Sequence, residues 1–186
     1  MEHVREDSAL ETGGLLLRFV NTRPIVQPID HLGNADVAKE WFVKDGSIDD
    51  DALVTDADAA SARELRTALV TLLKAHVGIE EEVELESAER VLERFANMHQ
   101  LVSRLGVREA KFEAAESGVA GALGGVLADT TTLALDEREW VRFKACKNPA
   151  CYRGFRDNSR PGSALYCSHT CASQVGMRAY RERKAS

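Results

Sequence analysis

Two short cysteine-bounded stretches lie near the carboxyl end of the chain, Cys146-Lys147-Asn148-Pro149-Ala150-Cys151 and Cys167-Ser168-His169-Thr170-Cys171. They contain all 4 cysteines of the 186 residues, so residues 1–145 have none. Two close pairs of thiols separated by a short spacer are what a tetrahedral structural zinc site requires, because each pair supplies two soft ligands from one turn. The spacing predicts zinc as the cofactor, bound by Cys146, Cys151, Cys167 and Cys171.

Three other interpretations of these cysteines stay open. Two disulfides would need an oxidising compartment, but residues 1–7 show no apolar signal segment and no stretch has membrane-spanning length. We therefore expect a cytoplasmic protein with no membrane partner, in which such thiols more often bind metal. Redox-active thiols fit less well, because neither pair has Cys-x-x-Cys spacing. His169 could replace one cysteine, although four thiolates already close the coordination shell.

The sequence around the cysteines predicts a small finger. Asn148-Pro149 favours a turn that brings the first two sulfurs to one side. Residues 152–166 are long enough for a hairpin, and residues 168–170 offer good caps for a helix from about Cys171 towards Lys184. Knuckle, hairpin and helix together describe a treble-clef-like finger, which has too little apolar area to fold without its metal.

Charge divides the chain near the same place. Residues 142–186 carry ten Lys or Arg and two acidic residues, which leaves 14 basic and 28 acidic residues in 1–141. An acidic body therefore carries a basic tail. A basic module attracts nucleic acid through counterion release, so DNA is the expected partner. The alternative is a basic face that docks on its own acidic body.

The arginines of the tail are the candidate DNA contacts. Arg178 and Arg181 lie three residues apart and share one surface of the expected helix. Arg153, Arg156 and Arg160 add positive charge from the expected hairpin. The planar fork of arginine donates two hydrogen bonds to a phosphate, which positions a protein on DNA without specifying sequence. The alternative is that the helix-end cations complement the dipole of their own helix.

The body, residues 1–140, is expected to be a helical domain, and residues 141–186 a separate zinc finger. Apolar residues make up 44% of the chain and aromatic residues only 6%, a composition that favours helices over a β-sandwich. Apolar periodicity and caps predict helices over 37–42, 59–77, 87–105 and 119–135, a short strand over 107–114, and either a strand or a helical turn over 15–20. The fold class is thus mainly α.

Three polar residues of the body are candidate ligand contacts. Arg18, Asn21 and Thr22 flank the apolar run at 15–20 and could line a small pocket for a polar or anionic ligand. The alternative is a turn in which Asn21 and Thr22 satisfy backbone groups. No Ser–His–Asp set, phosphate loop or paired carboxylate motif stands out in the sequence, so we do not expect an enzyme.

The chain resembles the CGNR zinc-finger proteins. The resemblance rests on Arg18-Phe19-Val20-Asn21-Thr22, on Asp30 and Trp41, on Ala62-Arg63-Glu64-Leu65-Arg66, and on the four-cysteine tail that ends in Arg178-Ala179-Tyr180-Arg181. Members of that family pair an N-terminal ABATE domain with a C-terminal finger and are regarded as stress-induced bacterial transcription regulators. The resemblance implies a DNA-binding regulator whose N-terminal domain senses a ligand or a partner.

One departure from the family pattern concerns Gln174. The tetrapeptide that names the family begins at the last cysteine, and here it reads Cys171-Ala172-Ser173-Gln174. Gln174 stands where the family has arginine, and it can offer hydrogen bonds to nucleic acid without a positive charge. The second hypothesis for the whole chain is an interaction adaptor, in which zinc only folds a surface that docks on an acidic protein.

Overall fold

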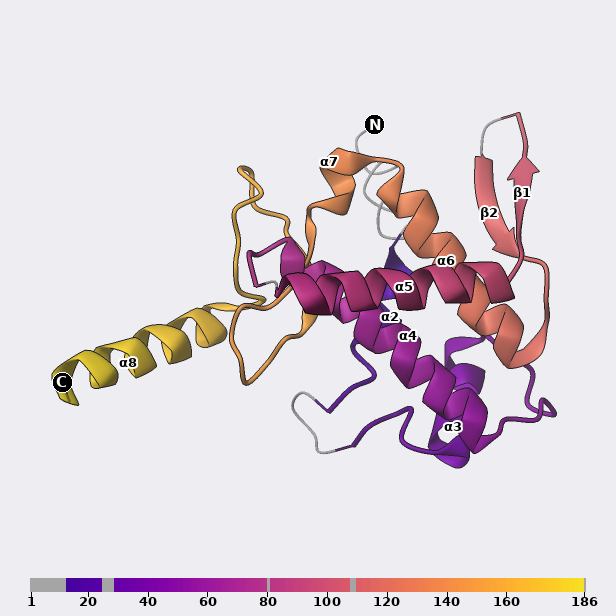
Figure 1. Ribbon diagram of the computed structural model, residues 1–186, viewed down its shortest axis with the longest axis horizontal. Helices are drawn as coiled ribbons and strands as arrows, with labels where there is room; N and C mark the ends of the chain where they lie inside the picture. Colours follow the sequence, from indigo (N-terminus) through magenta and orange to yellow (C-terminus); the bar gives the residue numbers. More distant parts are fainter. Residues whose placement is uncertain (1–12, 25–28, 80, 108–109, 186) are drawn as a thin grey trace, which may run out of the picture.

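The computed structural model describes residues 13–24, 29–79, 81–107 and 110–185, and this part of the chain is mainly helical, which confirms the predicted fold class. The elements follow one another as α2 (Gly14–Val20), α3 (Ala35–Asp45), α4 (Asp56–Ala75), α5 (Glu82–Met98), β1 (Leu101–Leu105), β2 (Ala110–Ala114), α6 (Gly118–Ala134), α7 (Glu137–Trp140), β3 (Phe143–Ala145), β4 (Gly154–Arg156) and α8 (His169–Ala185). Helix α8 projects away from the rest of the molecule (Figure 1). No helix among the described residues is long and apolar enough to cross a membrane.

Helix α4 packs against helices that precede and follow it in the sequence and against β3 of the finger. A capping box fixes its start, because the Thr55 side chain accepts from the Asp58 amide and the Asp58 side chain accepts from the Thr55 amide. The helix therefore begins before the expected residue 59. Leu65, Leu69 and Leu73 lie on its buried face, and α2, α3, α5, α6 and β3 all contact it.

Residues 15–20 belong to a helix, α2, and not to a strand. The Asp129 carboxylate of α6 accepts from the Gly13 amide at 2.9 Å and from the Leu16 amide at 3.0 Å, so it caps α2 from another element. Leu16, Phe19 and Val20 are then fully buried in the core. A capping carboxylate 113 residues along the chain from Leu16 left no local signal that could separate the two alternatives.

Helices α3 and α6 lie close to their predicted positions. Helix α3 follows Asn34, whose side chain accepts from the Val37 amide at 3.2 Å, and ends at Gly46 with a φ of 76°. Helix α6 meets β2 closely, since a Cβ atom at Gly124 would lie 2.9 Å from the Cβ of Ala114. The small residues of α6 therefore permit this close approach.

The predicted helix over 87–105 is wrong at both ends. Helix α5 starts at Glu82 and stops at Met98, and residues 101–105 form β1, which pairs antiparallel with β2. Val102 and Leu105 keep helical spacing in the sequence, but they are 38% and 83% exposed, so they do not extend the buried face of α5. The strand predicted over 107–114 is confirmed for 110–114; residues 108–109 lie outside the described part of the chain.

The hairpin of the finger is displaced from the predicted one. Strand β3 pairs with β4, with Phe143 opposite Arg156 and Ala145 opposite Gly154, so the first cysteine pair lies in the turn of the hairpin. The stretch after β4 folds instead around Asp157, whose buried carboxylate accepts from the Lys144 ammonium and from the Ala164 amide, both at 2.8 Å. Residues 157–166 therefore form a loop and not the second half of a hairpin.

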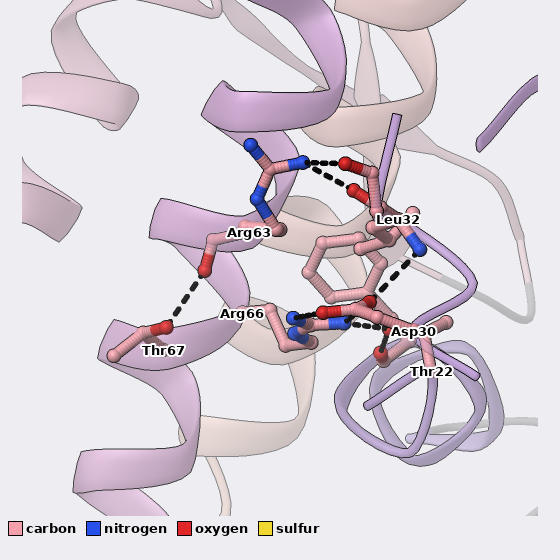
Figure 2. A network of polar contacts seen from close by, with 8 residues as sticks. Thr22, Asp30, Leu32, Arg63, Arg66 and Thr67 are labelled. Carbon is pink, nitrogen blue, oxygen red and sulfur yellow. Dashed lines mark hydrogen bonds and ion pairs between the residues drawn. The ribbon is translucent and has the colours of Figure 1, made fainter. Parts of the chain in front are cut away.

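A partly buried polar network joins α2, the loop after it and α4 (Figure 2). The Arg66 guanidinium donates to both oxygens of Asp30, at 2.6 and 2.7 Å, and to the Thr22 hydroxyl at 3.0 Å. One turn earlier, Arg63 donates to the carbonyl oxygens of Leu32 and Gly33. Two arginines of α4 thus hold the loop that leads into α3, and the bidentate ion pair is the central contact.

Replacing Asp30 by Asn is expected to lower the free energy of unfolding by about 2 kcal/mol at neutral pH, because Arg66 would keep a buried charge without a counter-charge. The value is below that of a fully buried pair because the Asp30 side chain is 28% exposed. Urea denaturation measures the difference. Glu64→Gln is the matched control, since the Glu64–Arg94 pair is about half exposed on both sides, and it should leave the midpoint unchanged.

The same contact predicts a pH dependence. Burial acts to raise the pKa of Asp30, but hydrogen bonding to Arg66 outweighs it and holds the pKa below its ordinary value of 3.8. A depressed pKa stabilises the fold above the unfolded-state value. The stability difference between wild type and Asp30→Asn should therefore be full at neutral pH and shrink as the pH falls below about 4. An unchanged difference at acid pH would contradict this assignment.

Candidate functional site

The four thiol groups converge on one point at the base of the finger. Their sulfur atoms all lie within 4.8 Å of one another, and the distances from Cys167 Sγ to Cys151 Sγ and to Cys171 Sγ are both 3.8 Å. Sulfurs placed tetrahedrally at about 2.3 Å from a zinc ion are about 3.8 Å apart. All four cysteines are free thiols, so the arrangement is that of a metal site and not of two disulfides.

Backbone hydrogen bonds place the first two thiols, and a helix places the last. Cys146 directly follows β3, is fully buried, and donates its amide to the Arg153 carbonyl at 2.8 Å across the hairpin. Cys151 closes the turn by donating its amide to the Asn148 carbonyl at 2.8 Å. Cys171 lies in the first turn of α8, which brings the second pair to the same point. His169 is exposed and lies outside this cluster.

The thiols differ in their readiness to lose a proton. Burial raises the pKa of Cys151 and of Cys167, and neighbouring thiols raise that of Cys167 further. Burial acts on Cys171 in the same direction, but hydrogen bonds to Asn148 and Ser168 outweigh it and lower the pKa of Cys171 to about 7. One thiolate is thus ready at neutral pH, and binding of a divalent metal ion would release the protons of the others.

A buried ion pair stabilises the loop that connects the two cysteine pairs. The Lys144 ammonium lies 2.8 Å from the Asp157 carboxylate, and the two side chains are 4% and 0% exposed. Burial acts to raise the pKa of Asp157, but hydrogen bonds from Lys144 and Ser159 hold it far below its ordinary range, so the carboxylate is charged. Lys144 also donates to the Gly162 carbonyl at 2.6 Å, which fixes the loop between the two cysteine pairs.

The candidate DNA contacts fall into two groups. Gln174, Arg178 and Arg181 lie on one face of α8, where they line an open cleft of about 680 Å³ with His169, Thr170, Ser173 and Met177. The Gln174 side chain accepts from the Asn148 amide group at 2.9 Å, so it also ties α8 to the knuckle. Arg153 and Arg160 are exposed on other parts of the finger, whereas Arg156 is bound by Glu139 of α7 at 2.7 Å.

The structure brings the three candidate ligand contacts together but gives each an internal partner. Arg18, Asn21 and Thr22 line a cleft of about 410 Å³ with Trp41 and other residues of α3. Arg18 is paired with Asp45, and Thr22 is buried and bonded to the Phe19 carbonyl and to Arg66. Asn21 reaches the finger, where its amide group donates to the Gly154 carbonyl at 3.0 Å and its oxygen accepts from the Gly154 amide at 2.9 Å.

Sequence reasoning gave no role to several residues that support the site. Asn148 was expected only to favour a turn, but its buried side chain bonds to the Ala150 amide and to Gln174. Lys144 and Asp157 were counted as tail charges, although they neutralise each other inside the finger. The Asn148-Pro149 turn signal could have drawn attention to Asn148. The two residues of the ion pair are 13 residues apart, so no local sequence signal indicates their contact.

Two family models match the chain. The ABATE model, described as "Putative stress-induced transcription regulator", matches residues 13–139, and the CGNR zinc finger model matches residues 142–184. Comparison with curated proteins found no match.

Replacing Asn21 by Ala is expected to cost about 1–3 kcal/mol of stability, because it leaves the amide and carbonyl of buried Gly154 without their side-chain partner. Hydrogen exchange at the Gly154 amide should accelerate more than exchange in α4. Ser163→Ala, at an exposed position of the finger, is the control and should change neither quantity by a comparable amount. Equal protection of the Gly154 amide in both variants would show that the Asn21 side chain does not stabilise this position.

Proposed function

This chain belongs to the ABATE family and carries a CGNR zinc finger, and we propose that it is a zinc-dependent DNA-binding transcription regulator. The observation that carries the proposal is the position of α8. The helix begins at the fourth thiol, projects from the body (Figure 1), and presents Arg178 and Arg181 on an open face. Such a regulator would act in the cytoplasm.

Zinc is the metal that suits four thiolates at these distances. Thiolate sulfur is a soft ligand, and four sulfurs at the corners of a tetrahedron are typical of structural zinc. Four protein ligands leave no open position for a water molecule, so the ion would stabilise the finger and not catalyse a reaction. Its binding can contribute roughly 10–16 kcal/mol to folding of such a small module.

The DNA contacts come chiefly from α8. A helix with arginines on a free face can approach a groove while the guanidinium groups bind phosphates on the backbone. Gln174 adds hydrogen bonding but no charge at the start of that face. Arg156 is a weaker candidate than Arg178, because Glu139 already neutralises it.

The body is the proposed sensor for a ligand or a partner protein. Its contacts with the finger at Gly154 give a route by which a change in the body reaches the zinc site. A second candidate function is a protein-interaction adaptor, which the exposure of Met177 and Tyr180 on α8, 53% and 55%, favours. An apolar side chain exposed on a projecting helix suits a protein partner as well as a DNA groove.

Removing zinc with a chelator is expected to release α8 while leaving α4, α6 and the β3–β4 hairpin folded, because the body holds the hairpin and the metal site is the main attachment of α8. Hydrogen exchange measured residue by residue tests this, with fast exchange expected in residues 167–185 and unchanged protection in α4 and at the Gly154 amide. Adding back zinc should restore the protection in wild type but not in Cys171→Ser. Unchanged exchange in the finger after complete chelation would contradict the proposal.

The zinc-loaded protein is expected to bind duplex DNA more weakly as the salt concentration rises. In Arg178→Ala with Arg181→Ala, the slope of log affinity against log salt concentration should fall by the amount expected for about two phosphate contacts. Filter binding over a range of salt concentrations measures both effects. Arg90→Ala with Arg138→Ala removes the same charge from exposed positions of the body and is the matched control. Absence of DNA binding at low salt, with an acidic protein retained after nuclease treatment, would favour the adaptor instead.

A further inference from the structure

We propose that the body binds a small phosphate-bearing anion between α4 and the segment at Arg23 and Pro24, beside the two cations that contact the ring of Tyr152. The pocket has a volume of about 300 Å³ and is lined by Arg23, Pro24, Arg66, Thr67, Val70, Thr71 and Lys74. It is separate from the cleft at Arg18 and from the face of α8. Binding of the anion does not depend on the proposed function. Only its role as the signal for the regulator rests on that function.

The pocket concentrates positive charge in a body that is otherwise acidic. Three of its seven lining residues are cations, Arg23, Arg66 and Lys74, and none of the seven is acidic. Asp30 neutralises Arg66 through the bidentate ion pair. Among the described residues, no carboxylate lies within ion-pair distance of Arg23 or Lys74, so two positive charges in the pocket lack a counter-charge.

Arg23 and Lys74 both contact the aromatic ring of Tyr152. The Lys74 ammonium lies 4.4 Å from the centroid of the Tyr152 ring, and the Arg23 guanidinium carbon lies 5.8 Å from it. A ring offers a modest attraction to each cation but does not cancel the repulsion between them. Burial lowers the pKa of Arg23, and the charge of Arg66 lowers it further, although the charge of Asp30 acts in the opposite direction.

An anion with several oxygens fits this arrangement best. The guanidinium of Arg23 can donate two hydrogen bonds to one phosphate while Lys74 supplies a point charge to the same group. The Thr67 and Thr71 hydroxyls donate to helix carbonyl oxygens one turn earlier, so the two cations carry the recognition. The volume suits a phosphate or a small phosphate ester, and two of the three cations that line it are sheltered from solvent, Arg66 buried and Arg23 partly so.

Tyr152 connects the pocket to the metal site. It directly follows Cys151, and its backbone has a φ of 49°, a left-handed conformation that few non-glycine residues adopt. Its amide donates to the Asn148 carbonyl at 3.2 Å within the knuckle. An anion that draws Arg23 and Lys74 away from the ring would change the contacts of a residue next to a zinc ligand, which is how occupancy would reach the finger.

The test is calorimetric titration of the full-length, zinc-loaded protein with inorganic phosphate, at near-neutral pH and constant ionic strength set with chloride. Wild type should bind phosphate saturably at one site. Arg23→Gln with Lys74→Met should bind it more than about tenfold more weakly, since both charge-assisted contacts are lost. Arg90→Gln with Lys39→Met removes the same charge elsewhere on the body and should bind as wild type does.

The other outcomes separate this inference from the proposed function. No saturable binding to wild type, or equal binding by the two double variants, overturns the pocket. If Arg23→Gln with Lys74→Met loses DNA affinity as far as Arg178→Ala with Arg181→Ala does, the cations belong to a duplex interface and the small anion is wrong. If phosphate binds as expected while wild type fails to bind DNA, the anion-binding site is supported and the proposed DNA-binding function is contradicted.

Discussion

The convergence of four thiol groups is the constraint on which the carboxyl-terminal module depends. The three segments that bring them together share little apolar contact of their own: the buried Phe143 and Ala145 belong to the core of the body, and α8 is largely exposed beyond its first turn. The Lys144–Asp157 pair orders the loop at 157–166, but it does not reach α8. The sulfurs of Cys151, Cys167 and Cys171, together with the Asn148–Gln174 hydrogen bond, bring the helix to the hairpin, so a metal ion at the centre of the sulfurs would hold α8 in a fixed direction.

The finger is bound to the body by polar contacts around a small apolar anchor. Phe143 fills the core beside α4, and its carbonyl faces the His76 ring nitrogen at 2.6 Å. Asn21 holds Gly154 by two hydrogen bonds, and Glu139 holds Arg156. Burial lowers the pKa of His76, so this contact is made by a neutral ring at neutral pH. Because β3 and β4 are fixed to the body in this way, the direction of α8 relative to the body is set by the metal site and by the Asn148–Gln174 hydrogen bond beside it.

The sequence predicted what local signals encode and failed where the partner is distant. The apolar pattern and caps around residues 37–42 predicted α3, the Asn148-Pro149 turn predicted the knuckle, and the four cysteines predicted the site itself. Residues 15–20 stayed ambiguous because their cap, Asp129, comes from another helix. The helical spacing of Val102 and Leu105 suggested a longer α5, but both are exposed on a strand. For Asn21 the sequence left open a ligand contact or a local turn, but both ends of its amide bind Gly154, 133 residues away, a contact that only the fold reveals.

We propose that a zinc ion is held by these four sulfurs. X-ray absorption at the zinc edge of the purified, full-length protein tests for this ion, because the fine structure reports the identity, number and distance of the atoms around the metal. We expect one zinc per chain with four sulfur neighbours at about 2.3 Å and no nitrogen or oxygen in the coordination shell. Substoichiometric zinc in protein purified without chelator, or a shell that contains nitrogen or oxygen atoms in place of a sulfur, would contradict it.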